Sequence, residues 1–281
     1  LLLSALTLSA GDVTSTGGIV SLSGGGQLSG TGKLDVSGST WGLGGDFVKD
    51  NGTLTSSGTL TLSETDLALS GNSKLTSDVA LSFVNLNLND SKLTLGSPTD
   101  NLTVQNAITI DASTEGILTG EADLILMSAL TMSEGLLQSS GGTWEFNGDF
   151  KKTSGTLSIT ETDLTLTSSI TLTSDDVLSF ATLNLNTFTL TLGNSTSDLT
   201  IEEAITIDSS GEGISTGEAD LKLSAFQNIS IGSVTSTGGT ISLLAGGKLS
   251  GTGKLDVSGS TWVLGGDFVK SSGTLTISQT N

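Results

Sequence analysis

The sequence predicts an all-β protein, a parallel β-helix or β-solenoid of about 14 coils with about 20 residues and three strands in each coil. Three observations predict it: long stretches of sequence recur, short apolar strands follow one another at about seven residues, and one copy of the repeat lacks the length of a coil. Helices are not expected, because apolar residues alternate with polar ones and Gly and Thr are frequent.

The long repeats set the organisation of the chain. The segment Gly32–Thr55 returns almost unchanged as Gly253–Thr276, an offset of 221, and Gly58–Leu124 matches Gly155–Leu221 at an offset of 97. We therefore expect a single continuous solenoid over 1–281, made of about two and a half long repeats. Their approximate bounds are 1–125, 126–222 and 223–281.

A finer pattern of apolar triplets indicates the strands. Triplets such as LDV at Leu34, LNL at Leu86, LTL at Leu93 and ITI at Ile108 place apolar side chains at alternate positions. This is the period of a short strand with one buried face. Gly, Ser, Asn and Asp fill the gaps, as turns require.

A length difference between the copies predicts the size and shape of the coil. From a Ser-Ala motif to the following Trp, the numbering advances by 37 in the first copy (Ser4 to Trp41), by 38 in the third (Ser224 to Trp262) and by only 16 in the second (Ser128 to Trp144). The second copy thus falls short by 21 or 22, the length of three strands and their turns, which make one turn of a three-sided helix. A solenoid tolerates this loss because each coil contacts only its neighbours.

Both ends of the sequence fall within the repeat pattern. Leu1–Ala10 resembles the apolar part of a signal peptide, but closely similar residues recur at Leu124–Ser133, which favours a structural unit. We expect this sequence to be a window of a longer chain, or a module that associates end to end with copies of itself. No apolar run reaches the roughly 18 residues of a membrane helix, so no membrane insertion is expected in this segment.

Composition argues against catalysis and against anionic partners. The chain has no Cys, His, Tyr or Arg, about a third of it is Ser and Thr, and its formal net charge is -19. Nucleic acid and anionic membranes are therefore not expected as partners. Polysaccharide-cleaving β-helices need clustered Asp or a basic residue in a groove, whereas the Asp residues here are dispersed, so the protein is not expected to be an enzyme.

Recurrent acidic residues leave two interpretations open. Asp from adjacent coils could hold calcium through oxygen ligands, or Asp could form turns by bonding nearby backbone. We favour turns, and no residue is assigned as catalytic, cofactor-binding or metal-binding. The acidic positions that recur are Asp46, Asp149 and Asp267 in Gly-Asp-Phe, Asp111 and Asp208 after Ala-Ile-Thr-Ile, and Glu121, Asp123, Glu218 and Asp220 in Gly-Glu-Ala-Asp.

Aromatic and threonine residues also have two interpretations. Trp41, Trp144 and Trp262 could stack on sugar rings, but we expect them in the core beside Phe47, Phe150 and Phe268. Paired threonines are similar to the flat arrays of ice-binding solenoids, but their sequence spacing is not constant, which predicts no regular lattice. The pairs are Thr165/Thr167, Thr171/Thr173 and Thr189/Thr191.

The repeated lines GTLTLSETDLALSG and GSTWVLGGDFVKSSGTLTIS resemble the β-strand repeats of bacterial autotransporter passengers and filamentous-haemagglutinin-like adhesins. This resemblance implies a secreted protein at the cell surface with adhesive or filament-forming work. Two functions remain open: an extracellular structural filament or stalk, and an adhesin passenger that binds a host, surface or carbohydrate ligand.

Overall fold

The computed structural model describes residues 1–29, 31–49, 59–61, 64–77 and 80–279. The end of the repeat that begins at Gly32, and Gly58 at the start of the second repeated block, lie outside these ranges. The described residues form strands and turns and contain no helix, so none that could cross a membrane. They fold into two compact units, Leu1–Thr143 with Ser154–Ser158, and Trp144–Thr153 with Ile159–Asn281.

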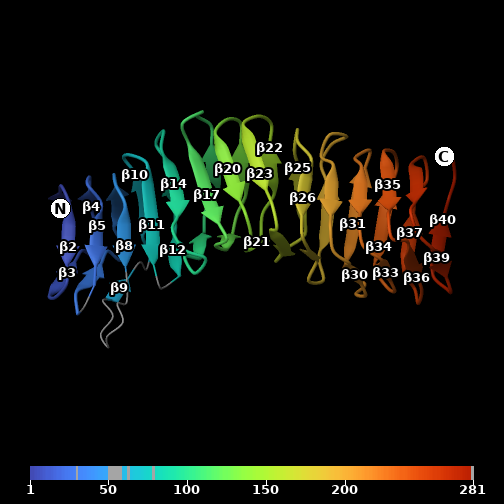
Figure 1. The fold of residues 1–281 in the computed structure, drawn as a ribbon, viewed down its shortest axis with the longest axis horizontal. Helices are drawn as coiled ribbons and strands as arrows, with labels where there is room; N and C mark the ends of the chain where they lie inside the picture. Colours follow the sequence, from blue (N-terminus) through green and yellow to red (C-terminus); the bar gives the residue numbers. More distant parts are fainter. Residues whose placement is uncertain (30, 50–58, 62–63, 78–79, 280–281) are drawn as a thin grey trace. The chain divides into compact units, whose positions relative to one another are not determined.

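Each unit is a three-sided β-solenoid. In every sheet, neighbouring strands pair in parallel and lie three places apart in the chain, so one coil contributes one strand to each side (Figure 1). The predicted fold class is therefore confirmed, including its parallel pairing.

In the first unit, one side is built of β1 (Leu2–Leu3), β4 (Ile19–Leu22), β7 (Thr40–Leu43), β10 (Asp66–Leu69) and β13 (Leu86–Asn87). A second side is built of β2 (Leu6–Leu8), β5 (Gly26–Leu28), β8 (Phe47–Lys49), β11 (Ser73–Ser77), β14 (Lys92–Leu95), β17 (Gly116–Gly120), β20 (Leu136–Ser139) and β23 (Thr156–Ile159). The remaining strands are β3 (Asp12–Thr14), β6 (Lys33–Asp35), β9 (Thr59–Thr61), β12 (Leu81–Phe83), β15 (Leu102–Val104), β16 (Ile108–Ile110), β18 (Leu124–Leu126) and β19 (Leu130–Met132).

In the second unit, the longest side is built of β22 (Phe150–Lys152), β25 (Ile170–Thr173), β28 (Thr189–Leu192), β31 (Gly213–Gly217), β34 (Ser233–Ser236), β37 (Lys254–Asp256) and β40 (Thr274–Thr276). Another is built of β26 (Leu178–Phe180), β29 (Leu199–Ile201), β32 (Leu221–Leu223), β35 (Thr240–Leu243) and β38 (Thr261–Leu264). The others are β21 (Thr143–Phe146), β24 (Asp163–Leu166), β27 (Leu183–Asn184), β30 (Thr206–Ile207), β33 (Gln227–Ile229), β36 (Gly247–Leu249) and β39 (Phe268–Lys270).

Apolar ladders along the inside of each unit form the core. Alternate residues of a strand point inward, and parallel pairing places each above its counterpart in the next coil. Val20 thus pairs with Trp41 and Trp41 with Leu67, all of them fully buried. In the second unit, Leu190 and Ile214 pair in the same way and are equally buried.

The coils are fewer and longer than predicted. The described residues form about 12 turns at a spacing of about 21 residues, where 14 turns of about 20 were expected. Leu67 pairs with Leu86, an interval of 19 in the numbering, but Phe47 pairs with Leu75, an interval of 28. Strand pairing sets only the stacked positions, so turns of different length are accommodated between them.

The missing coil is visible in the order of strands. In the first copy the Ser-Ala motif precedes β2 and the Trp lies in β7, and in the third they mark β33 and β38, five strands apart in each case. In the second copy they mark β19 and β21, only two strands apart. Among the described strands the difference is three, one complete coil, as predicted. The extra residue of the third copy is Phe226, which is exposed in the turn before β33.

Candidate functional site

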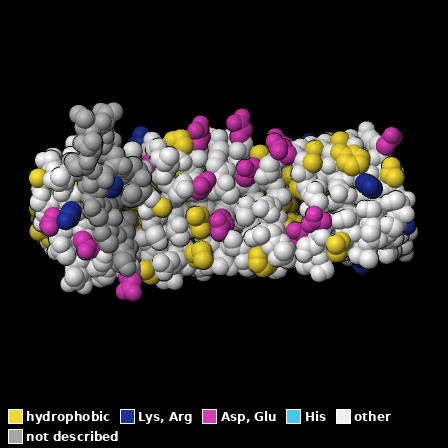
Figure 2. Space-filling view, turned by 90° about the horizontal axis from the view of Figure 1, so that it is seen from below, with side chains coloured by type: hydrophobic (Ala, Val, Ile, Leu, Met, Phe, Trp, Pro, Cys, Tyr) yellow, Lys and Arg dark blue, Asp and Glu magenta, His cyan; other side chains and the backbone are white. Residues whose placement is uncertain are grey.

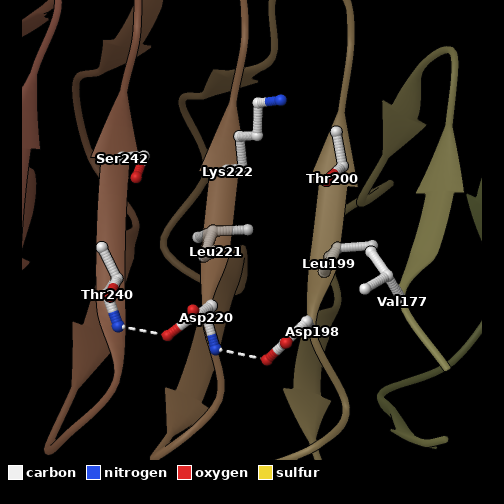
Figure 3. A pocket seen from close by; sticks show the side chains of 9 residues that line it. All are labelled: Val177, Asp198, Leu199, Thr200, Asp220, Leu221, Lys222, Thr240 and Ser242. Atoms are coloured by element: carbon white, nitrogen blue, oxygen red, sulfur yellow. Dashed lines mark hydrogen bonds between the residues drawn. The ribbon is translucent and has the colours of Figure 1, made fainter. Parts of the chain in front are cut away.

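An open groove of about 220 Å³ lies on the outer surface of β29, β32 and β35 in the second unit (Figure 3). It combines two carboxylates, one lysine, several hydroxyls and an exposed apolar side chain, Val177. The residues that line it are Val177, Asp198, Leu199, Thr200, Asp220, Leu221, Lys222, Thr240 and Ser242.

The two carboxylates of the groove each cap the following coil. One oxygen of Asp198 accepts a hydrogen bond from the Asp220 backbone N–H at 2.9 Å, and one oxygen of Asp220 accepts from the Thr240 N–H at 2.6 Å (Figure 3). Each bond satisfies a backbone donor next to the start of a strand. The arrangement is a staircase in which every step is held by the side chain of the coil before it.

The same staircase occurs in the first unit, at the repeat offset of 97. Asn101 accepts from the Asp123 N–H at 3.4 Å, and Asp123 accepts from the Thr143 N–H at 2.8 Å. The side-chain amide oxygen of Asn101 thus accepts the hydrogen bond that the carboxylate of Asp198 accepts in the second unit. The bond requires an oxygen acceptor, and the negative charge of Asp198 is not needed for it.

Substitution of Asp220 should distinguish the acceptor from the charge. Asp220→Asn is expected to change the free energy of unfolding by less than about 0.5 kcal/mol, because the amide oxygen can accept the same bond. Asp220→Ala should cost about 1 kcal/mol, since the Thr240 N–H loses its partner. Urea melts of both variants measure this; a loss with Asn as large as that with Ala would contradict the staircase interpretation.

The Gly-Asp-Phe carboxylates also bond the backbone of the next coil. Asp46 accepts from the Lys74 N–H at 3.0 Å and Asp149 from the Thr171 N–H at 2.7 Å. The third, Asp267, is exposed. The predicted turn-forming role is therefore wrong at Asp46 and Asp149: each carboxylate does accept from backbone, but from that of the following coil and not of its own turn.

Two glutamates that sequence analysis missed organise another turn. One oxygen of Glu115 accepts from the Asp111 and Ala112 N–H groups, and the other accepts from the Asp90 N–H of the preceding coil. Glu212 does the same at the offset of 97, and at both sites the Asp after Ala-Ile-Thr-Ile serves through its backbone. The bonded N–H at residue 90 or 187 belongs to a residue with positive φ. The signal in the sequence was a Glu at the fourth position after the recurring Asp.

The acidic side chains that the structure describes do not gather into a metal site. Within the described ranges, no group of three or more His, Cys, Asp or Glu side chains could hold a metal ion. In the view of Figure 2 the acidic side chains are dispersed over the surface among uncharged ones. Of the Gly-Glu-Ala-Asp motif residues, Asp123 and Asp220 belong to the staircases, while Glu121 and Glu218 are exposed.

Calcium removal provides a direct check. Because the described carboxylates form no cluster that could hold an ion, we expect a chelator to leave the melting temperature unchanged within about 2 °C. An ion that bound only the folded state would stabilise it measurably, so its removal would lower the melting temperature. Thermal melts in chelator and in added calcium measure this. Unfolding by the chelator that calcium reverses would show that the recurrent carboxylates bind calcium.

Asp100 is a carboxyl group buried in the first unit. Its oxygens accept from the N–H groups of Ser77, Gly96 and Ser97 at 2.5 to 2.7 Å. Burial raises the pKa of Asp100, and these three bonds oppose that shift only in part. The equivalent residue in the second unit is Ser197, whose hydroxyl accepts from the Ser174 N–H at 3.0 Å. The site is thus a structural cap that a neutral side chain can also supply.

Lys152 is a buried cation that binds the next coil of the second unit. Its side chain is 1% exposed, and its ammonium group contacts the partly exposed carboxylates of Asp175 and, at 2.8 Å, Asp176. Burial lowers the pKa of Lys152, but the hydrogen bonds and charges of the two aspartates outweigh burial and raise the pKa above that of an ordinary lysine. Lys49 is buried at the matching position of the first copy.

We expect loss of the carboxylates to harm stability more than loss of the lysine. Asp175→Asn with Asp176→Asn should cost about 2 kcal/mol, because a buried ammonium group then lacks a counter-charge; partial exposure keeps this below the value for a fully buried pair. Lys152→Met, similar in length but uncharged, should cost less than about 1 kcal/mol. Urea melts measure both variants, with Lys151→Met at the exposed neighbouring position as the control.

The pH dependence of this contact follows from the raised pKa. The stabilisation is fully present below the pKa of an unfolded lysine, about 10.4, and is lost as the pH rises through the higher folded pKa of Lys152. The wild type should therefore lose stability relative to Lys152→Met in alkaline solution above that range. Equal alkaline melting of the two proteins would contradict the ion pair.

Trp41 and Trp144 belong to the core, as predicted. Trp41 is fully buried, with its ring centroid 4.8 Å from that of Phe47, edge to face. Trp144 is 1% exposed and reaches Phe150 through Phe146, each ring pair stacked at 5.9 Å. A sugar could not stack on either buried indole.

Trp262 packs against Phe268 at 5.2 Å and is partly exposed. It therefore contributes less buried surface than its two counterparts.

Comparison with protein-family models, with curated proteins and with solved structures finds no match to this chain.

Proposed function

We propose that this chain is a non-enzymatic, extracellular structural repeat protein, part of a bacterial surface filament, stalk or fibre built by stacking β-solenoid coils. The observation that carries the proposal is the repetition of contacts between coils. The staircase at Asp198 and Asp220 recurs at Asn101 and Asp123, and the glutamate turn at Glu212 recurs at Glu115. Repeated contacts between neighbouring coils allow a solenoid to be extended coil by coil, as a filament or stalk requires.

Ladders of polar side chains on the outside support the same proposal. The Asn85 amide donates to the Asp66 carboxylate at 2.7 Å, and the Asn106 amide donates to the Asn85 oxygen at 2.9 Å. The side chains thus connect three successive coils of the first unit. Such connections stiffen a stack of coils, which a stalk requires.

Its partners would be further coils, either in a longer chain or in copies that associate end to end. Electron microscopy of the native material tests this: filaments or stalks whose width matches one solenoid are expected. Dispersed particles that never extend beyond a single chain would contradict the proposal.

An adhesin passenger is the second candidate, favoured by the groove at Asp198. The first copy keeps the staircase but differs in the side chains around it: Asn101 stands in place of Asp198 and Ile125 in place of Lys222. A groove that changes while its scaffold is kept can carry ligand selectivity. A host, surface or carbohydrate ligand would then meet the carboxylates, the lysine and Val177.

Substitutions to the residues of the first copy test this candidate. Asp198→Asn with Lys222→Ile should leave the melting temperature unchanged, since the first unit accepts both residues. Cell or surface adhesion is then compared between the two proteins. Adhesion lost without lower stability would favour the adhesin, and unchanged adhesion would favour the purely structural function.

A further inference from the structure

The outer face of β25, β28, β31 and β34 in the second unit carries hydroxyl groups in rows. Parallel pairing places Thr171 beside Thr191, Thr191 beside Ser215, and Ser215 beside Thr235. A second row runs along Thr189, Gly213 and Ser233. The Thr and Ser side chains of both rows are partly exposed.

This regularity corrects the expectation of no lattice for Thr171, Thr189 and Thr191, whereas Thr165 pairs with Asn184 and Thr173 with Lys151, outside the rows. From one member of the first row to the next, the numbering advances by 20, then 24, then 20. The uneven interval is taken up in the turns, and the paired strands still hold the hydroxyls in register. Neighbouring members of a row are about 4.8 Å apart from coil to coil, and the two rows lie about 6.6 Å apart along each strand. In the second row Gly213 has no hydroxyl, so the hydroxyls of Thr189 and Ser233 are two coils apart.

The first unit shows that the fold does not demand these residues. At the equivalent positions, offset by 97, it has Lys74 for Thr171, Lys92 for Thr189, Leu118 for Ser215 and Gln138 for Thr235. The inward residues of the same strands are kept or changed conservatively. The buried pairs are Leu75/Leu172, Leu93/Leu190, Ile117/Ile214 and Leu137/Val234.

Over β25, β28, β31 and β34, the second unit thus has no charged or bulky side chain in these rows, while the core beneath them is kept. A general preference of strands for Thr does not explain this, because the matching strands of the first unit pair in the same way and carry different side chains. The substitutions point to a function of the face itself.

The chemistry of the face suits an ordered layer of water. Threonine is stiff at χ1, so its hydroxyl and methyl group have few orientations on a strand. No charged side chain lies in the two rows from β25 to β34; Asp149 and Lys151 adjoin them at β22, and Lys254 and Asp256 continue them at β37. Waters that bridge neighbouring hydroxyls would therefore repeat at the spacing of the coils.

We propose that this face, Thr171, Thr189, Thr191, Ser215, Ser233 and Thr235, binds the surface of ice. The spacing from coil to coil and along the strand is similar to the two repeats of oxygen positions on a prism face of hexagonal ice. Water held by the rows can then join the crystal lattice, which fixes the protein to ice without any charged contact. This function goes beyond a structural stalk and does not depend on it.

The experiment compares ice growth in the presence of the whole chain and of a variant that carries the residues of the first unit. The variant is Thr171→Lys, Thr189→Lys, Ser215→Leu and Thr235→Gln, and it should fold because the first unit accepts all four residues. Thr165→Lys, at an outward position of β24, is the control. Circular dichroism melts establish that all three proteins are folded.

The wild type and Thr165→Lys should shape ice crystals, slow recrystallisation and partition into growing ice, and the fourfold variant should lose all three effects. A folded wild type without any effect on ice would overturn the proposal. Equal loss in Thr165→Lys would overturn the assignment to this face. Retention of the wild type on cellulose or chitin through the same four residues, with no effect on ice, would overturn it in favour of a crystalline polysaccharide.

Discussion

Removal of residues 221–240 is expected to leave a folded β-solenoid, whereas removal of residues 221–230 is expected to abolish folding. The first deletion takes out one coil of the second unit, because Leu221 pairs with Ile241 and Lys222 with Ser242. Ile241 then occupies the position of Leu221, and every later strand keeps its side and its inward face.

The shorter deletion cannot preserve these pairings. Half a coil moves each later strand to another side of the solenoid, so buried residues such as Ile241 and Leu243 lose their stacked partners. In a strand, a wrong register turns the apolar side chains toward water. The second copy, which lacks one coil between its Ser-Ala motif and Trp144, already shows that a whole coil is dispensable.

Circular dichroism and urea melts of the two deletions provide the measurement. The longer deletion, over 221–240, should melt cooperatively with a β spectrum, and the shorter one, over 221–230, should show no cooperative transition. Equal stability of the two proteins would contradict the coil register.

Trp144→Ala is expected to lower the free energy of unfolding by about 3 to 5 kcal/mol, as for large aromatic residues truncated in a core. Its indole is 1% exposed and lies 5.9 Å from the ring of Phe146 and 6.0 Å from that of Phe180. The substitution would leave a large cavity among rings that cannot close it by small movements.

Trp262→Ala is the matched control, since it removes the same side chain from the same sequence motif. Trp262 is partly exposed, so less buried surface is lost and the cost should be smaller. Urea melts compare the two variants. Equal losses would mean that burial of the indole does not determine its contribution.

Much of this architecture could be predicted from the sequence, because a solenoid is built from local patterns. Alternation within each triplet identifies residues such as Leu93 and Leu190 as inward-facing, and both are fully buried. The shorter distance from Ser128 to Trp144 in the second copy identifies a coil of three strands. The number of coils was overestimated because turn length leaves no periodic signal.

The candidate sites were harder to predict, because they depend on which residues of different coils meet. Asp220 recurs as Asp123, and Asp198 corresponds to Asn101. Nothing in this spacing indicates that each side chain caps the backbone of the next coil. Glu115 was missed for the same reason: one of its partners, Asp90, belongs to the coil before it.

The sequence by itself determined the fold class, the inward residues and the repeat of the coil, since burial of alternate apolar residues acts within a few neighbouring positions. Only the tertiary structure decided which side chains of different coils meet: buried Lys152 contacts Asp175, and on the outer face Thr171, Thr191, Ser215 and Thr235 form one row. The physical reason is that inward packing sets the register of each strand. Because the turns differ in length, residues that lie side by side in neighbouring coils are not a constant number of residues apart in the sequence.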